Sequence, residues 1–126
     1  MVRETEVLLK TVVEAMEDKK AENIVVLDLK ELSPLVDYFV ICSGVSKVHL
    51  DTLAENVLKK LKEEHDFYPS HVEGTSGSGW ILIDAQDIII HIFSPKKREF
   101  YDLEGLWWEA RRVDLSSEQK EEITLV

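Results

Sequence analysis

Residues 80–93 read Trp-Ile-Leu-Ile-Asp-Ala-Gln-Asp-Ile-Ile-Ile-His-Ile-Phe, and this stretch decides the fold of the chain. Its two ends, 80–84 and 88–93, are apolar and rich in β-branched residues, which is typical of strands. Between them, Asp84-Ala85-Gln86-Asp87 has the composition of a tight turn. The pattern predicts a β-hairpin of two antiparallel strands.

Aromatic residues are concentrated in this hairpin and just after it. Six of the ten in the chain lie between Trp80 and Trp108. Large rigid aromatics at the end of a sheet either complete a core or serve as anchors for another protein. Because no catalytic constellation accompanies them, the sequence indicates binding rather than chemistry.

The part of the chain before the hairpin predicts two amphipathic helices and three strands. Apolar residues recur at helical spacing over 4–20 and, more regularly, over 46–64. Strands are predicted at 24–29 and 38–42, and the unbroken apolar run of the second indicates a strand covered on both faces. A further short strand is expected at 69–73.

After the hairpin, Ser94 is suited to cap a final helix that has Pro95 at its first position. The order is then helix, strand, strand, helix, strand, strand, strand, helix. It favours an α+β fold, a mixed five-stranded sheet with packed helices. We expect one domain over residues 1–112, followed by a polar C-terminal tail at 113–126 that is helical or frayed.

The charge balance bears on the kind of partner. The chain has 25 acidic and 15 basic residues, a formal net charge of -10. This charge opposes contact with nucleic acid or anionic lipid and favours a basic partner, although solubility alone also explains it. The strongest basic run, Lys96-Lys97-Arg98, is short and typical of a solvated helix surface. We therefore expect little or no direct nucleic-acid contact.

The sequence also bears on the compartment. No apolar run approaches the ~18 residues that a membrane-spanning helix needs. The chain starts with charged residues rather than a signal sequence. Cys42 is the only cysteine, which excludes an internal disulfide and is compatible with a reducing compartment. We expect a cytoplasmic protein that does not contact membranes.

No residue pattern points to catalysis or to metal binding. Cys42 falls in a strand that is predicted to be buried, where thiols are inert. No pair of His or Cys residues has metal-ligand spacing, and no Gly-x-x-x-x-Gly-Lys-Ser/Thr motif for phosphate is present. We expect no catalytic residue, no metal and no cofactor.

A nucleotidyltransferase-like enzyme is the competing class. The order of a strand, Ser43-Gly44 and a long helix is similar to the start of nucleotidyltransferase domains, which hold Mg²⁺ on two carboxylates of a following strand. Here such spacing occurs at Glu64 and Asp66, at a helix end, and at Asp102 and Glu104, beyond the predicted sheet. Neither pair has a rigid strand as a platform. A related fold without activity is therefore favoured.

Five segments together carry a family resemblance. They are 36–44 (Val-Asp-Tyr-Phe-Val-Ile-Cys-Ser-Gly), Glu73-Gly74, 79–84 (Gly-Trp-Ile-Leu-Ile-Asp), 90–93 (Ile-His-Ile-Phe) and 98–107 (Arg-Glu-Phe-Tyr-Asp-Leu-Glu-Gly-Leu-Trp). Each is a modest signal by itself, but in this order they span nearly the whole chain and are specific. The chain resembles the ribosomal silencing factor family, also called Iojap-related proteins.

The resemblance implies a nucleotidyltransferase-like fold that lacks the catalytic carboxylates. It also implies a translational repressor that binds the large ribosomal subunit through the ribosomal protein numbered fourteen and sterically blocks joining of the small subunit. An acidic chain suits this role, because a basic ribosomal protein attracts it while the surrounding RNA repels it. A homodimeric scaffold is a third possible function.

Expected partner contacts are carried over from the same segments. The full set is Trp80, Leu82, Asp84, His91, Tyr101, Asp102, Leu103 and Glu104. Strand alternation supports part of it, since Trp80, Leu82 and Asp84 project from one face of their strand. Two members have a structural alternative. Trp80 is also suited to a core, and His91, which interrupts a run of isoleucines, to a buried position bonded to a neighbour.

Overall fold

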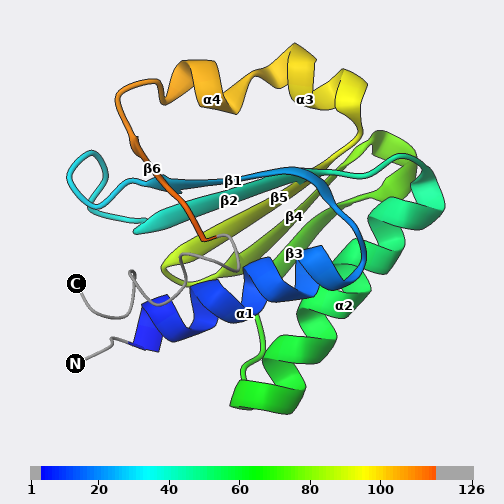
Figure 1. The fold of residues 1–126 in the computed structure, drawn as a ribbon, viewed down its shortest axis with the longest axis horizontal. Coiled ribbons are helices and arrows are strands. Elements are labelled where there is room, and N and C mark those ends of the chain that lie inside the picture. The colour runs from blue at the N-terminus through cyan, green and yellow to red at the C-terminus, as the bar shows by residue number, and fades with distance from the viewer. Residues whose placement is uncertain (1–3, 116–126) are drawn as a thin grey trace.

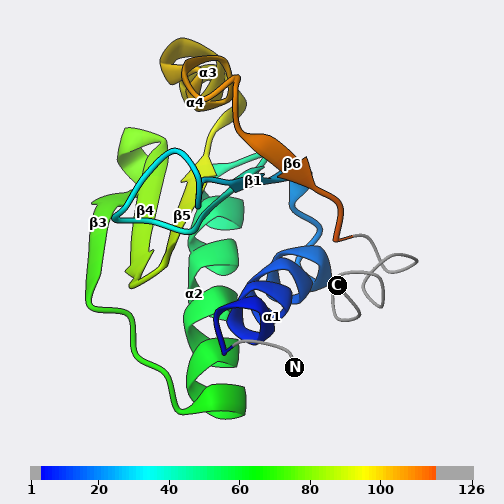
Figure 2. The ribbon, with the colours of Figure 1, turned by 90° about the vertical axis from the view of Figure 1, so that its left-hand side faces the viewer.

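The structure is a computed structural model, and it describes residues 4–115. Its elements in chain order are α1 (Glu4–Asp18), β1 (Glu22–Asp28), β2 (Tyr38–Ser43), α2 (Lys47–His65), β3 (His71–Thr75), the short 3-10 helix η1 (Ser76–Ser78), β4 (Trp80–Ala85), β5 (Ile88–Phe93), α3 (Pro95–Tyr101), α4 (Leu103–Leu106) and β6 (Arg111–Val113). The strands form one sheet. Helices α1 and α2 pack on one of its faces, and α3 and α4 cross the other (Figure 1, Figure 2).

The strands lie in the order β3-β4-β5-β2-β1-β6. Strands β2 and β5 are parallel, and all other neighbouring pairs are antiparallel. The predicted hairpin is confirmed, with Trp80 of β4 opposite Phe93 of β5. In its turn, Gln86 has a φ of 64° and donates its backbone N–H to Asp84 Oδ1. The aspartate thus stabilises the turn that sets the register of the hairpin.

The α+β class and the predicted helices and strands are confirmed, but the sheet has six strands rather than five. The additional strand, β6, is three residues long and starts with two exposed arginines, so it lacks the apolar alternation that marks a strand. Distant partners hold it in place. Val113 lies opposite Val26 of β1, and Arg111 Nη2 donates to Asp28 Oδ2 at 3.2 Å.

The expected boundary between domain and tail falls inside β6. The strand continues past residue 112 to Val113, and Leu115 is buried against the core. The division into a domain over 1–112 and a tail over 113–126 stays a prediction. The remainder of that tail, 116–126, lies outside the described residues.

The larger apolar core lies between the sheet and the two long helices. Along β5, Ile88, Ile90 and Ile92 point toward the helices and are fully buried. Asn56 of α2 donates its side-chain N–H to the backbone oxygen of Ala15 in α1 at 2.8 Å, which links the helices within this layer. Helices α1 and α2 cover this face of the sheet, whereas Trp80, Leu82 and Asp84 on the opposite face are only half-buried.

The opposite face carries a segment that we call the strap, residues 95–110, which contains α3 and α4. The strap begins as predicted, since Ser94 Oγ accepts the backbone N–H of Lys97 at 3.2 Å and caps α3. Leu103 and Trp107 of the strap pack on a second buried cluster. That cluster consists of Leu27, Leu29, Ile41 and Phe93. We call this side of the sheet the strap face.

Candidate partner-binding site

Strand β4 brings three of the expected contacts to the strap face. Its burial alternates residue by residue, with Ile81 and Ile83 fully covered on the helix side. Trp80, Leu82 and Asp84 are half-buried and point the other way. This is the alternation that the sequence predicted. The strap leaves these three side chains partly open to solvent.

Trp80 is the centre of an aromatic group. Its ring stacks on Phe93 of β5 at a centroid distance of 5.0 Å. Tyr101, from the end of α3, lies on it at 4.6 Å. Trp80 therefore combines both functions that the sequence left open, because one part of it completes the second cluster while another part stays accessible. A rigid, partly buried aromatic is a good anchor, since little side-chain entropy remains to be lost on binding.

A hollow opens beside this aromatic group, with a volume of about 220 Å³. It is lined by Glu73, Gly74, Ser78, Trp80, Leu82 and Tyr101. Gly74 has a φ of 82°, and a Cβ there would lie 2.1 Å from the backbone oxygen of Trp80. A glycine is therefore required for β3 to approach β4 so closely. The result is an apolar hollow with Glu73 among its lining residues, and the carboxylate of Glu73 lies 3.0 Å from His71 Nε2.

His91 lies under Trp80 and is only 4% exposed. Its Nδ1 accepts the indole N–H of Trp80 at 3.1 Å. Phe39 packs edge-on against the imidazole at 4.7 Å. Burial lowers the pKa of His91 from 6.5 to about 4, so the ring is neutral near pH 7. His91 is thus a buried neighbour of the hollow and forms none of its wall.

The acidic residues of the strap are engaged within the protein. Asp102, with a φ of 44°, ends α3, and its Oδ1 accepts the backbone N–H of Gly105 at the start of α4. Glu104 accepts two hydrogen bonds from Arg98, and Arg98 also donates to Ser43 Oγ of β2 at 2.9 Å. Both carboxylates therefore fix the shape of the strap, and so does Leu103, which packs on the sheet.

The expected contacts thus separate into three groups. Trp80, Leu82 and Tyr101 meet at the hollow, and Asp84 lies further along the same face of β4. His91, Leu103, Asp102 and Glu104 support this surface from within or from the side. Sequence reasoning missed Glu73 as part of the site, although Glu73-Gly74 belongs to the family segments. Its position opposite Leu82 depends on the β3–β4 register.

The strap also exposes large apolar side chains away from the hollow. Phe100 is 75% exposed, Leu106 70% and Trp108 76%. The concentration of aromatics after the hairpin was the sequence signal for them. None of the three lines the hollow, so they provide matched controls for experiments on it.

Reactive groups are few within the described residues. Cys42 is completely buried, and burial raises the pKa of its thiol to about 12 although the charge of Arg98 lowers it. Asp66 caps the end of α2, so neither acidic pair considered above lies on a strand. Between residues 4 and 115, no three His, Cys, Asp or Glu side chains gather as metal ligands. No helix in the same range is long and apolar enough to cross a membrane.

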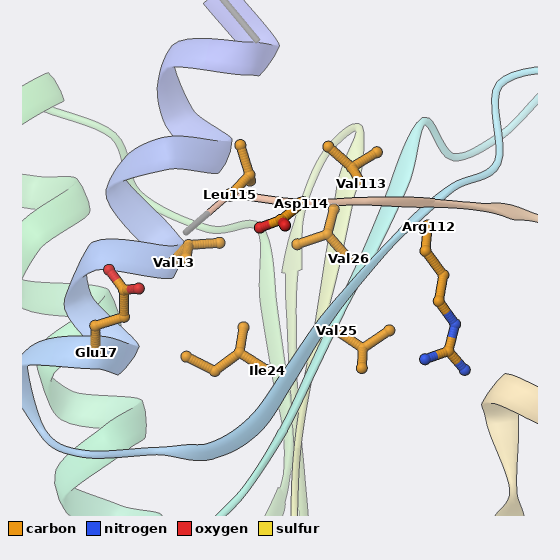
Figure 3. A pocket seen from close by; sticks show the side chains of 9 residues that line it. All are labelled: Val13, Glu17, Ile24, Val25, Val26, Arg112, Val113, Asp114 and Leu115. Atoms are coloured by element: carbon orange, nitrogen blue, oxygen red, sulfur yellow. The ribbon is translucent and has the colours of Figure 1, made fainter. Parts of the chain in front are cut away.

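A second groove lies at the other edge of the sheet, between α1, β1 and the chain around β6 (Figure 3). It has a volume of about 320 Å³. Val13, Ile24, Val26 and Leu115 give it apolar walls, and Arg112 is among its charged lining residues. None of the expected contacts lines this groove.

Comparison with known proteins places the chain in a family. Residues 2–124 match the family described as ribosomal silencing factor during starvation. The chain is 39% identical to the ribosomal silencing factor of Halalkalibacterium halodurans over 108 residues, which are 86% of this chain and 92% of that protein. It is also 34% identical over 98 residues to a mouse protein named mitochondrial assembly of ribosomal large subunit protein 1. That match covers 75% of this chain and 42% of the mouse protein.

A solved structure agrees with this assignment. The crystal structure of a protein from Chromobacterium violaceum has a TM-score of 0.79 to this chain at 34% sequence identity, and the match covers 83% of this chain and 87% of that one. The resemblance found in the sequence is confirmed by the family match over nearly the whole chain. This chain belongs to the ribosomal silencing factor family.

Proposed function

We propose that this chain represses translation in the cytoplasm by binding the large ribosomal subunit and sterically blocking the small subunit. The partner on the large subunit is the ribosomal protein numbered fourteen. The observation that carries this proposal is the hollow beside Trp80, Leu82 and Tyr101 on the open side of the sheet. The name of the family, and the large-subunit role in the name of the mouse relative, support the ribosome as the target.

The hollow suits a protein side chain rather than a substrate. Its aromatic wall consists of Trp80 and Tyr101, the residue types that dominate binding energy in protein interfaces. Glu73 also lines the hollow and its side chain is 61% exposed, so a basic side chain with an apolar stem fits both parts of the lining. A cation beside Trp80 also gains from the negative face of the indole ring.

The charge of the whole chain supports a basic protein as partner. With a net charge of -10, the chain is attracted to a cationic ribosomal protein and repelled by ribosomal RNA around it. Asp84 lies further along the same face of β4 and adds negative charge to the surface around the hollow. Complementary charge at the rim increases the association rate, while the anchored aromatics determine how slowly the complex dissociates.

Repression in this proposal requires no chemistry. A folded domain attached to the joining face of the large subunit occupies space that the small subunit must enter. The residues of the strap contribute indirectly, because Leu103, Asp102 and Glu104 fix the position of Tyr101 over Trp80. Full occupancy of the large subunit is therefore sufficient for full repression.

Subunit joining in a sucrose gradient tests this proposal. Wild-type protein at saturation is expected to shift ribosomes into separate subunits. A variant with Trp80→Ala and Tyr101→Ala should need at least about tenfold more protein, because hot-spot aromatics contribute about 2 kcal/mol or more each. The matched control combines Leu106→Ala with Trp108→Ala, which removes exposed apolar surface outside the hollow.

Two results would contradict the proposal. Ribosomes that form normally at saturating wild-type protein would reject the blocking mechanism. A folded double variant at the hollow that blocks joining as well as the control would reject the docking surface. Calorimetry with the purified ribosomal protein fourteen then identifies the partner, because binding to large subunits without binding to that protein would assign the contact to another component.

A further inference from the structure

His91 is enclosed by aromatic rings on the strap face. The imidazole lies 4.7 Å from Phe39, 5.8 Å from Trp80 and 6.0 Å from Phe93, measured between ring centroids. In the sheet it stands between Leu82 of β4 and Ile41 of β2. An aliphatic or aromatic side chain would be the ordinary occupant of such a position, since buried polar groups are costly without partners.

The hydrogen bond to Trp80 determines which nitrogen of His91 carries the proton. An indole N–H can only donate, so Nδ1 must accept and is unprotonated. The single hydrogen of the neutral ring is then on Nε2. This atom is buried and has no hydrogen-bond partner among residues 4–115. The chain therefore keeps a buried, unsatisfied N–H donor in order to have an acceptor for Trp80.

The unsatisfied N–H donor lowers the stability of the fold, whereas the hydrogen bond at Nδ1 fixes the orientation of the indole. Without an acceptor beneath it, the indole N–H of Trp80 would have to turn toward solvent, and the ring would lose its packing against Phe93 and Tyr101. The hollow would then lose its flat aromatic wall. Residues that hold a binding group in one orientation reduce the entropy lost on association.

We propose that His91 is a positioning residue that holds the indole of Trp80 in the orientation that receives the partner, without touching the partner itself. This inference rests on the proposed function, because it concerns the same surface. The inference predicts that affinity and stability respond differently to substitution at position 91. A hydrogen-bond acceptor there favours binding, whereas an apolar residue favours stability.

Two substitutions at position 91 separate these properties. In His91→Asn, the amide oxygen occupies the place of Nδ1 and still accepts the indole N–H, although the smaller amide packs poorly and brings unsatisfied donors of its own. In His91→Leu, the acceptor and the orphaned donor both disappear while the volume is nearly kept. We expect His91→Leu to retain the melting temperature of the wild type within about 3 °C or to exceed it.

Affinity should change in the opposite order. We expect His91→Leu to bind purified large ribosomal subunits about 5- to 10-fold more weakly in a co-sedimentation titration at pH 7.5. This factor corresponds to the loss of one hydrogen bond that preorganises Trp80 for binding. His91→Asn should restore binding to within about twofold of the wild type despite a lower melting temperature. Ile89→Val, on the same face of β5, is the matched control for a small packing change and should bind normally.

A spectroscopic measurement reports on the indole directly. The indole N–H resonance of Trp80, identified by its loss in Trp80→Phe, should exchange slowly with solvent in the wild type and in His91→Asn. In His91→Leu it should exchange at least about tenfold faster and move toward the shift of a solvent-exposed indole. A role of His91 in packing alone would not produce this difference between the Leu and Asn variants.

Three outcomes would overturn the inference. Normal affinity of His91→Leu would show that the indole needs no fixed acceptor. Equal losses of affinity in His91→Leu and His91→Asn would assign His91 a role in packing or in direct contact. An indole proton that stays protected in His91→Leu would remove the positioning mechanism.

Failure of the proposed function has a different signature. In that case Trp80→Ala would bind large subunits normally, and no substitution at position 91 would change affinity. The indole proton would nevertheless still respond to His91→Leu. The inference about binding would then be rejected together with the docking surface. If instead Trp80→Ala loses binding but the His91 variants bind normally, only the inference about His91 is rejected.

Discussion

Arg98 and Glu104, six residues apart, form a two-point ion pair across the junction of α3 and α4. The Nε–Oε1 distance is 3.1 Å, and the Nη2–Oε2 distance is 3.2 Å. The remaining nitrogen of the guanidinium, Nη1, donates to Ser43 at the end of β2. One arginine therefore joins the two helices of the strap to each other and to the sheet, and so keeps Tyr101 near Trp80.

Glu104→Ala tests this connection. The side chains are only 11% and 21% exposed, so removal of the carboxylate leaves a guanidinium that is largely buried and partly unpaired. We expect a loss of about 1–3 kcal/mol in the free energy of unfolding, measured by urea denaturation. Glu104→Gln keeps one acceptor and should lose less. Equal stability of the wild type and the Ala variant would show that the pair contributes nothing to the fold.

Asp102 is a second position where the shape of the strap can be tested. Its φ of 44° suits Asn and Asp better than other side chains, and its carboxylate caps α4. We expect Asp102→Asn to be nearly neutral, because Asn keeps both properties. Asp102→Ala should cost about 1–2 kcal/mol in urea denaturation. A difference below about 0.3 kcal/mol between the two variants would contradict the capping role.

The fold was largely predictable because its signals are local. The isoleucines of β5 and the hairpin turn before them specify β4 and β5, and the spacing of apolar residues specifies α1 and α2. Strand β6 gave no such signal. Its position depends on pairing with β1, more than eighty residues earlier in the chain, and on the contact between Arg111 and Asp28.

The sequence predicted which face of β4 carries the candidate site, but not which side chains of the site contact one another. Alternation along β4 gave the shared direction of Trp80 and Leu82 without further information. The hydrogen bond from Trp80 to His91 depends on how two side chains orient across the β4–β5 pair, and the turn of Glu104 toward Arg98 depends on how the strap folds. A carboxylate engaged in an internal pair looks the same in the sequence as one that meets a partner.

Cys42 provides a test of the helix-side core. Because burial raises the pKa of its thiol to about 12, almost none is ionised at pH 8, and no part of the residue reaches solvent. We expect no reaction of the native protein with a thiol-specific disulfide reagent over an hour, and one thiol per chain after unfolding in urea. Stoichiometric labelling within minutes under native conditions would contradict the described packing of β2.

The burial of His91 predicts how stability depends on pH. Its pKa is about 4 in the folded protein and 6.5 when unperturbed, so between these values the unfolded state binds more protons than the folded state. Stability therefore rises with pH across this window and is lost on acidification from about pH 6.5 toward 4. Between pH 7.5 and 4.5, the effect of this one residue is about 2.5 kcal/mol.

The comparison between wild type and His91→Leu isolates this effect, because the carboxylates titrate in both proteins. Urea denaturation at pH 7.5 and at pH 4.5 gives four free energies of unfolding. The stability of the wild type should fall by about 2–3 kcal/mol more than that of the Leu variant. Parallel losses in both proteins would mean that His91 is protonated in the folded state at pH 4.5, and then its Nδ1 could not accept the indole N–H of Trp80 at that pH.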